Sequence, residues 1–189
     1  IAPGTVIISA GGNCTDIRKV VEPVLQRDGG SIYYINLSQD DFKLGGSSFA
    51  QTLNTIGNEV PTIKDAAFFK RAFNTIQELI LDNNILAGHD IGSGGLITTL
   101  LEMCFADVNL GAKIDFSAFE EKDLVKILFS ENIGIVIQAK SDTEVESKLN
   151  ANNVSFYKSG IPSPALPEGA GAKLEIISSS LGLSPFDIK

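Results

Sequence analysis

The residues best suited to chemistry lie in one segment, Ile85–Ala106, with the sequence ILAGHDIGSGGLITTLLEMCFA. Apolar residues lead to His89 and Asp90, and a turn of three glycines and a serine follows before apolar residues recur at helical spacing. Glycine lets a backbone approach a ligand closely, and the first N–H groups of a helix favour phosphate. A carboxylate at a strand end can hold Mg²⁺ against nucleotide phosphates. The pattern is typical of a phosphate site at Gly92, Ser93, Gly94 and Gly95 with Asp90 as metal ligand.

The same segment has a purely structural interpretation. Strands, glycine-rich turns and helices often pack this way, and Asp90 could cap the following helix. Neither GxxxxGK[ST] nor GxGxxG is completed. His89, the sole histidine, is best interpreted as a hydrogen-bonded structural residue, so no catalytic residue is assigned. On the residues alone, the phosphate site and the packing turn remain open alternatives.

Three other polar segments are given structural interpretations. Gly45-Gly46-Ser47 looks like a phosphate loop, but a turn with Ser47 as the N-cap of a helix is favoured. Glu102 is interpreted as a solvent-facing or capping residue, and the run 115–123 as an exposed acidic face.

Composition narrows the class of protein. The net charge is −8 and the isoelectric point is near 4.6, with no Lys/Arg cluster, which argues against nucleic-acid binding. No apolar run approaches membrane-spanning length. The two cysteines, Cys14 and Cys104, form neither a metal-spacing pair nor a disulfide framework, and Cys104 is expected in the core. A cytoplasmic protein is therefore expected.

Hydrophobic periodicity and turn residues predict the elements around the candidate site. Strands are expected at 5–10, 31–37, 85–89, 109–116, 133–139, 154–158 and 173–178. Helices are expected at 16–25, from Ser48 through Ile56 to a C-cap at Gly57, and at 65–82, 94–106, 122–129 and 142–150. Residues 162–167 are expected to form a proline-rich surface loop.

This alternation predicts an α+β (α/β layered) fold, a mixed sheet with packed helices. The strands near 32–37, 85–89, 113–116 and 133–139 are expected in one sheet, covered by helices 65–82 and 94–106 through Phe69, Phe73, Ile76, Leu96 and Leu100. We expect residues 1–189 to form a single domain. Because the chain begins at Ile1 without an initiator Met, we expect a piece of a longer chain or a processed end.

Several segments carry a family resemblance. Residues 89–106 are similar to the HD-x-S-D-GGL…EM-x-FA signature of the C-terminal domain of the aminoimidazole ribonucleotide synthetase-related superfamily. Within it, the chain resembles the phosphoribosylformylglycinamidine synthase family: 44–51 resembles LGGSALAQ, 73–81 resembles F-x-x-I-Q-x-L-I, 128–138 resembles LF-x-E-E-x-G-x-V-I-Q, and 17–23 resembles V-R-K…P. The resemblance is strong over 15–139 and weak in the tail.

The resemblance implies an ATP-dependent amidoligase of de novo purine biosynthesis, which converts formylglycinamide ribonucleotide, ATP and glutamine-derived ammonia into the amidine, ADP and phosphate. This chain resembles the second C-terminal-type subdomain of the large form. The implied cofactors are Mg²⁺ and ATP/ADP, and the implied partners are the formylglycinamide ribonucleotide and other domains of the parent chain. Because the family's site lies between subdomains, we expect the isolated chain to fold but to lack synthase activity.

The resemblance also assigns residues. Asp90 matches the family's Mg²⁺-binding aspartate. The family's nucleotide-contacting serine falls at Gly92 and its next aspartate at Ser93, so Ser93 or the N–H of Gly92 is expected to substitute. Two alternatives stay open: a non-catalytic scaffold domain that holds a structural nucleotide, and a domain of another superfamily member such as a small-molecule kinase. The short chain argues against the latter.

Overall fold

The computed structural model describes residues 8–14, 16–164, 174–177 and 186–188. In these residues one sheet of seven strands runs in the order β2-β4-β1-β5-β3-β6-β7. The strands are β1 (Ile32–Asn36), β2 (Ile85–Asp90), β3 (Leu110–Asp115), β4 (Gly134–Ala139), β5 (Tyr157–Pro164), β6 (Leu174–Ile177) and β7 (Phe186–Ile188). Neighbouring strands are antiparallel except β3 and β6, which are parallel. The expected mixed sheet is confirmed.

The helices are α1 (Ser48–Thr52), α2 (Ala66–Leu81), α3 (Gly95–Phe105), α4 (Leu124–Phe129) and α5 (Asp142–Ala151), with a 3-10 turn η1 (Ile17–Lys19). Side-chain caps explain where two of them begin. The Asp65 carboxylate accepts from the N–H groups of Ala67 and Phe68 at the start of α2, and Asp123 plays the same part for α4. Both helices therefore start within two residues of the positions that the sequence predicts.

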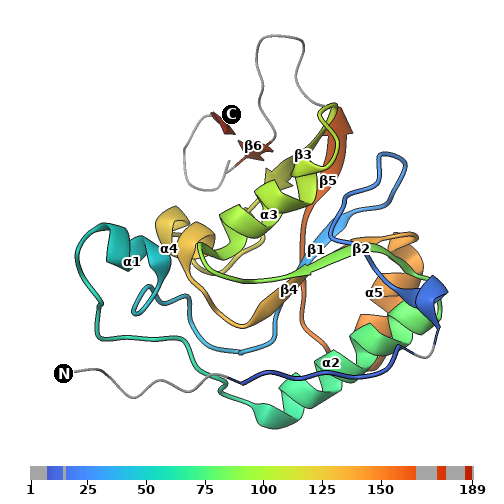
Figure 1. Ribbon diagram of the computed structural model, residues 1–189, viewed down its shortest axis with the longest axis horizontal. Coiled ribbons are helices and arrows are strands. Elements are labelled where there is room, and N and C mark those ends of the chain that lie inside the picture. The colour runs from blue at the N-terminus through green and yellow to red at the C-terminus, as the bar shows by residue number, and fades with distance from the viewer. Residues whose placement is uncertain (1–7, 15, 165–173, 178–185, 189) are drawn as a thin grey trace.

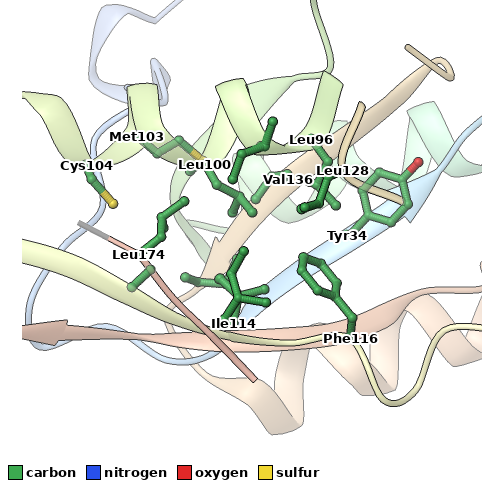
Figure 2. Close-up of a cluster of buried hydrophobic side chains, with 14 of the residues drawn as sticks. Tyr34, Leu96, Leu100, Met103, Cys104, Ile114, Phe116, Leu128, Val136 and Leu174 are labelled. Atoms are coloured by element: carbon green, nitrogen blue, oxygen red, sulfur yellow. The ribbon is translucent and has the colours of Figure 1, made fainter. Parts of the chain in front are cut away.

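Helices cover both faces of the sheet (Figure 1). Side chains of a strand point alternately to opposite faces, and β1 follows this rule. Ile32 and Tyr34 join the first core cluster, with α3 and α4. Tyr33 and Ile35 join the second, with α2 and α5. Figure 2 shows the first cluster, in which Leu96 and Leu100 of α3 lie opposite Ile114 of β3. The expected α+β layered fold is confirmed.

The predicted buried face of α2 is partly wrong. Phe73 is 49% exposed, whereas Ile76 is buried as predicted. The buried positions of α2 are Phe68, Ala72, Thr75, Ile76 and Leu79. That stripe lies one position before the predicted one, and both have helical spacing. Leu100 in α3 is buried, at 1% exposed, as predicted.

The N-terminal segment also differs from prediction. The helix expected at 16–25 is wrong beyond η1, because Pro23 lacks an N–H and disfavours helical backbone at the residue before it. The segment instead runs along β2, where the Gly88 N–H donates to the Glu22 carbonyl (3.1 Å). Of the strand expected at 5–10, residues 5–7 lie outside the described part of the chain, and residues 8–10 form no strand.

Two further boundaries are corrected. The helix expected to reach Ile56 ends at Thr52, because Asn54 is in the left-handed region at φ 55°, so Gly57 is not its C-cap. The loop expected at 162–167 is wrong for 162–164, which belong to β5; 165–167 lie outside the described residues. Residues 162–164 of β5 pair with β3 and extend past the end of β1. The side of β5 that faces away from β3 is therefore an open sheet edge at these residues, and such an edge tolerates proline.

The predicted acidic face is interrupted by core residues. Phe116 and Phe119, within the run 115–123, are both buried and stack edge to face. The strand expected at 154–158 begins only at Tyr157.

Candidate functional site

Asp90 is the last residue of β2, and its backbone is held firmly. Its carbonyl accepts from Nδ1 of His89 (2.8 Å) and from Oγ1 of Thr99 in α3 (3.1 Å). Its side chain is 85% exposed, with Oδ1 3.3 Å from Nδ1 of His89. A fixed backbone therefore presents an open carboxylate at the end of the strand, which suits a cation bound with solvent or ligand oxygens.

Asp90 does not cap the helix that follows. The N-cap of α3 is Gly94, at φ 91°, and no side chain caps through that residue. The capping interpretation of Asp90 is therefore wrong. His89 makes a second contact, with Nε2 3.2 Å from Oε2 of Glu102 on α3, so Glu102 pairs with His89 at a half-exposed position.

The glycines of the turn have different roles. Gly94 and Gly95 both have positive φ, 91° and 76°, which side-chain-bearing residues rarely adopt. A Cβ on Gly95 would lie 2.7 Å from the carbonyl oxygens of Leu128 and Ser130. A Cβ on Gly92 would meet nothing within 4 Å. Packing and backbone conformation thus require glycine at 94 and 95, but not at 92.

The N–H groups of the turn are divided in the same way. The Gly94 N–H donates to Oε1 of Glu131 (2.8 Å) and the Gly95 N–H to the Gly92 carbonyl (3.1 Å). Within the described residues, the N–H groups of Gly92 and Ser93 have no partner, and both residues are exposed. The donors open to an incoming anion are therefore those of Gly92 and Ser93, next to Asp90.

The second glycine motif forms a turn, as favoured from the sequence. Ser47 is the N-cap of α1: its Oγ accepts from the Ala50 N–H (3.1 Å) and donates to the Leu44 carbonyl (2.7 Å). The next N–H, that of Ser48, donates to Oε1 of Glu131 (2.8 Å). The sequence reasoning missed Glu131, although it lies inside the resembling segment 128–138; no spacing rule links a glutamate to turns 37 and 83 residues away.

The metal prediction fits this geometry only as a partial site. The described residues contain no group of three or more His, Cys, Asp or Glu side chains that could hold a metal ion. Mg²⁺ commonly takes one or two carboxylates and completes its shell with phosphate oxygens and water. One exposed carboxylate beside two open N–H groups is compatible with that donor set, with the phosphate supplied by a nucleotide.

A pocket of about 370 Å³ adjoins Asp90 on the α2 face of the sheet. Its walls are mostly apolar and include Ile76, Ile80, Ile135 and Ile137. The Asp90 end of the candidate site thus lies beside an apolar pocket.

In the part of the chain that the structure describes, no helix has the length and apolar character needed to cross a membrane.

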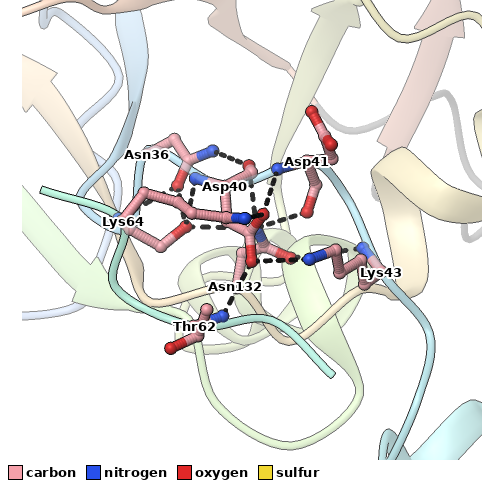
Figure 3. A network of polar contacts seen from close by, with 8 residues as sticks. Asn36, Asp40, Asp41, Lys43, Thr62, Lys64 and Asn132 are labelled. Carbon is pink, nitrogen blue, oxygen red and sulfur yellow. Dashed lines mark hydrogen bonds and ion pairs between the residues drawn. The ribbon is translucent and has the colours of Figure 1, made fainter. Parts of the chain in front are cut away.

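A second polar cluster surrounds Asp40, in the loop after β1 (Figure 3). The side chain is fully buried and accepts from Nζ of Lys43 (2.9 Å) and from the N–H groups of Thr62 and Asp41 (2.9 Å each). Burial alone would raise the pKa of this carboxyl, but these hydrogen bonds outweigh burial and lower the pKa to about 2. These contacts join the loop after β1 to the segment that carries Thr62, so the cluster holds two loops together.

Comparison with known proteins places these features in a family. A family model described as AIR synthase related protein, C-terminal domain, matches residues 27–160, which include both glycine turns and Asp90. A probable phosphoribosylformylglycinamidine synthase, chloroplastic/mitochondrial, of Arabidopsis thaliana is 40% identical over 158 residues, covering 82% of this chain and 11% of that protein. A probable phosphoribosylformylglycinamidine synthase of Caenorhabditis elegans is 32% identical over 188 residues, covering 93% and 14%. This chain therefore spans only a small part of either relative, and the resemblance stated from the motifs is confirmed.

Solved structures share the fold at low sequence identity. Thermotoga maritima PurL complexed with FGAR superposes with a TM-score of 0.62 at 18% identity, over 86% of this chain and 27% of that one. The same protein complexed with ATP gives 0.59 at 14% identity, over 92% and 26%. These likenesses support the fold.

Proposed function

Because this chain belongs to the family of AIR synthase related C-terminal domains, we propose that it is one domain of a phosphoribosylformylglycinamidine synthase. Residues 1–189 would form a single domain of that longer enzyme, an ATP-dependent amidoligase of purine biosynthesis with glutamine as amido donor. The names of the Arabidopsis and Caenorhabditis relatives support this proposal. We also predict a cytoplasmic location for this enzyme. The name of the Arabidopsis relative gives chloroplast or mitochondrion for that protein.

The contribution of this domain would be a Mg²⁺-nucleotide phosphate site, for ATP or ADP. The observation that carries the proposal is the open carboxylate of Asp90 beside the unpaired N–H groups of Gly92 and Ser93. Asp90 would hold Mg²⁺, and the two N–H groups would bind a phosphate oxygen. When bound, the cation would neutralise phosphate charge, which is the main requirement of phosphoryl transfer.

The residues of this chain would orient the nucleotide without supplying a nucleophile. The backbone of Asp90 is held through its carbonyl by His89 and Thr99, so its carboxylate would meet a cation from a fixed position at the end of β2. Gly94 and Gly95 would contribute by shaping the turn, since their N–H groups already have partners in the chain. The formylglycinamide ribonucleotide and the remaining nucleotide contacts would come from other domains, so the isolated chain would lack synthase activity.

Titration of ADP with and without Mg²⁺ tests this proposal, using wild type, Asp90→Asn and Asp28→Asn. Asparagine keeps the size of the side chain and removes the charge, and Asp28 provides an exposed control. We expect the Mg²⁺-dependent affinity to fall at least several-fold in Asp90→Asn alone, with unchanged binding in the absence of Mg²⁺. Equal affinities in all three proteins would remove Asp90 from the site.

A scaffold role, with a structural nucleotide, is the second candidate. It is favoured by Gly92 and Ser93, which stand where the resemblance expects a serine and an aspartate. In the full-length parent enzyme, a scaffold site predicts that Asp90→Asn lowers the bound nucleotide and the melting temperature while turnover per folded enzyme is unchanged. A large fall in kcat would instead favour the catalytic site.

A further inference from the structure

One oxygen atom joins the two glycine motifs of this chain. Oε1 of Glu131 accepts from the N–H of Gly94, the N-cap of α3, and from the N–H of Ser48, the first residue of α1, each at 2.8 Å. The two motifs lie 46 residues apart in the sequence, counted between Ser48 and Gly94. A charged acceptor forms stronger hydrogen bonds than a neutral one, so this carboxylate stabilises both turns at once.

The position of Glu131 is set by the residues on either side of it. Asn132 is buried, and its side-chain amide donates to the carbonyls of Asp40 (3.2 Å) and Asp41 (3.0 Å). On the other side, the Ser130 carbonyl lies in contact distance of Gly95, where no Cβ would fit. A glutamate anchored at both neighbours presents its carboxylate with little freedom.

A ring contact joins α1, which begins at the first of these turns, to α4. The rings of Phe49 in α1 and Phe129 in α4 stack with their centroids 4.7 Å apart, and α4 leads directly into the loop that carries Glu131. The α1 turn, this loop and the α3 turn therefore form one packed unit.

We propose that Glu131 is a positioning residue for the nucleotide site, an inference that rests on the function proposed above. By taking the Gly94 N–H, the carboxylate fixes the turn so that the N–H groups of Gly92 and Ser93 face outward beside Asp90. It also couples the turn at Gly45–Ser48 to the one at Gly92–Gly95. The nucleotide phosphate is met at Gly92 and Ser93, while Glu131 keeps its place behind the turn.

The charge of Glu131 and its hydrogen bonds have opposite effects on a bound phosphate. The hydrogen bonds order the turn, whereas the negative charge repels a phosphate nearby. Glu131→Gln keeps an acceptor oxygen and removes the charge, so we expect it to bind Mg-ADP as tightly as wild type or tighter. Glu131→Ala leaves both N–H groups without the acceptor, so we expect its affinity to fall by about tenfold.

The experiment combines Mg-ADP titration with amide hydrogen exchange measured residue by residue. Wild type, Glu131→Gln, Glu131→Ala and the exposed control Glu120→Ala are compared well below their melting temperatures. In Glu131→Ala the amides of Gly94 and Ser48 should exchange about tenfold faster or more, with Ile137 in β4 unchanged. The other two variants should match wild type at both turns.

Each of the following results would overturn one part of this proposal. Wild-type exchange at Gly94 and Ser48 in Glu131→Ala would refute the shared hydrogen bond. Faster exchange at both turns with wild-type Mg-ADP affinity would leave Glu131 as a helix cap without a positioning role. Tighter binding in both Glu131 variants would show that the carboxylate occupies the place of the phosphate. Failure of wild type to bind Mg-ADP would sink the proposed nucleotide site, whereas the exchange rates would still decide whether Glu131 joins the turns.

Discussion

Asp40 offers a quantitative test of how this fold is held together. Its two carboxylate oxygens divide their partners: Oδ2 accepts from Lys43 and Thr62, and Oδ1 accepts from the Asp41 N–H and lies 3.4 Å from Nζ of Lys64. Asp40→Asn replaces one of these oxygens with an NH₂ group, which cannot accept. The substitution therefore removes the charge and leaves one set of donors without an acceptor.

The expected magnitude has two parts. The pKa of Asp40 falls from an ordinary value of 3.8 to about 2 in the fold, which corresponds to roughly 2 kcal/mol of stability at neutral pH. Losing a neutral hydrogen bond to the replaced oxygen adds about 1 kcal/mol at every pH. Since the pKa is lower in the folded state, the ionic part is complete above the unfolded value of 3.8 and is lost as the pH falls toward 2.

We therefore expect Asp40→Asn to lower the free energy of unfolding by about 3 kcal/mol at pH 7 and by about 1 kcal/mol near pH 2. Urea unfolding of wild type and variant between these pH values measures the difference. Asp41→Asn is the matched control, because Asp41 is an exposed neighbour that joins this network through its backbone N–H and carbonyl. A difference between wild type and Asp40→Asn that does not change with pH would refute the assignment of the ionic contribution to Asp40.

Two substitutions in the glycine turn test the different roles of Gly92 and Gly95. Gly92→Ser should leave the free energy of unfolding within about 0.5 kcal/mol of wild type, since a Cβ there has open space, and should strengthen Mg-ADP binding in the same titration. A loss of stability above about 1 kcal/mol would contradict the open geometry. Gly95→Ala should lower the melting temperature and cost roughly 2–4 kcal/mol in urea unfolding, because of its positive φ and the two carbonyl oxygens 2.7 Å from its Cβ; wild-type stability would show that the turn relaxes freely.

The regular elements near the site could be predicted because their signals are local. The strand expected at 85–89 and the helix expected at 94–106 are observed as Ile85–Asp90 and Gly95–Phe105. The buried face of α2 could not be assigned in this way, because Phe68 and Phe69 each begin an apolar stripe at helical spacing. Which stripe turns inward is decided by the sheet and by α5, and these contacts are not encoded in the periodicity of α2 itself.

The turn divides into a part that the packing interpretation describes and an exposed part where the proposed phosphate site would lie. Gly94 and Gly95 form the packing turn: their conformation and the close approach of the 128–130 backbone require glycine, and Glu131 takes the Gly94 N–H. Asp90, Gly92 and Ser93 form the exposed part, where the carboxylate and two N–H groups are open. A string of glycines does not distinguish a residue that needs positive φ from one that leaves room for a ligand. Gly95→Ala should therefore change stability, and Gly92→Ser should change nucleotide binding, although both alter the same motif.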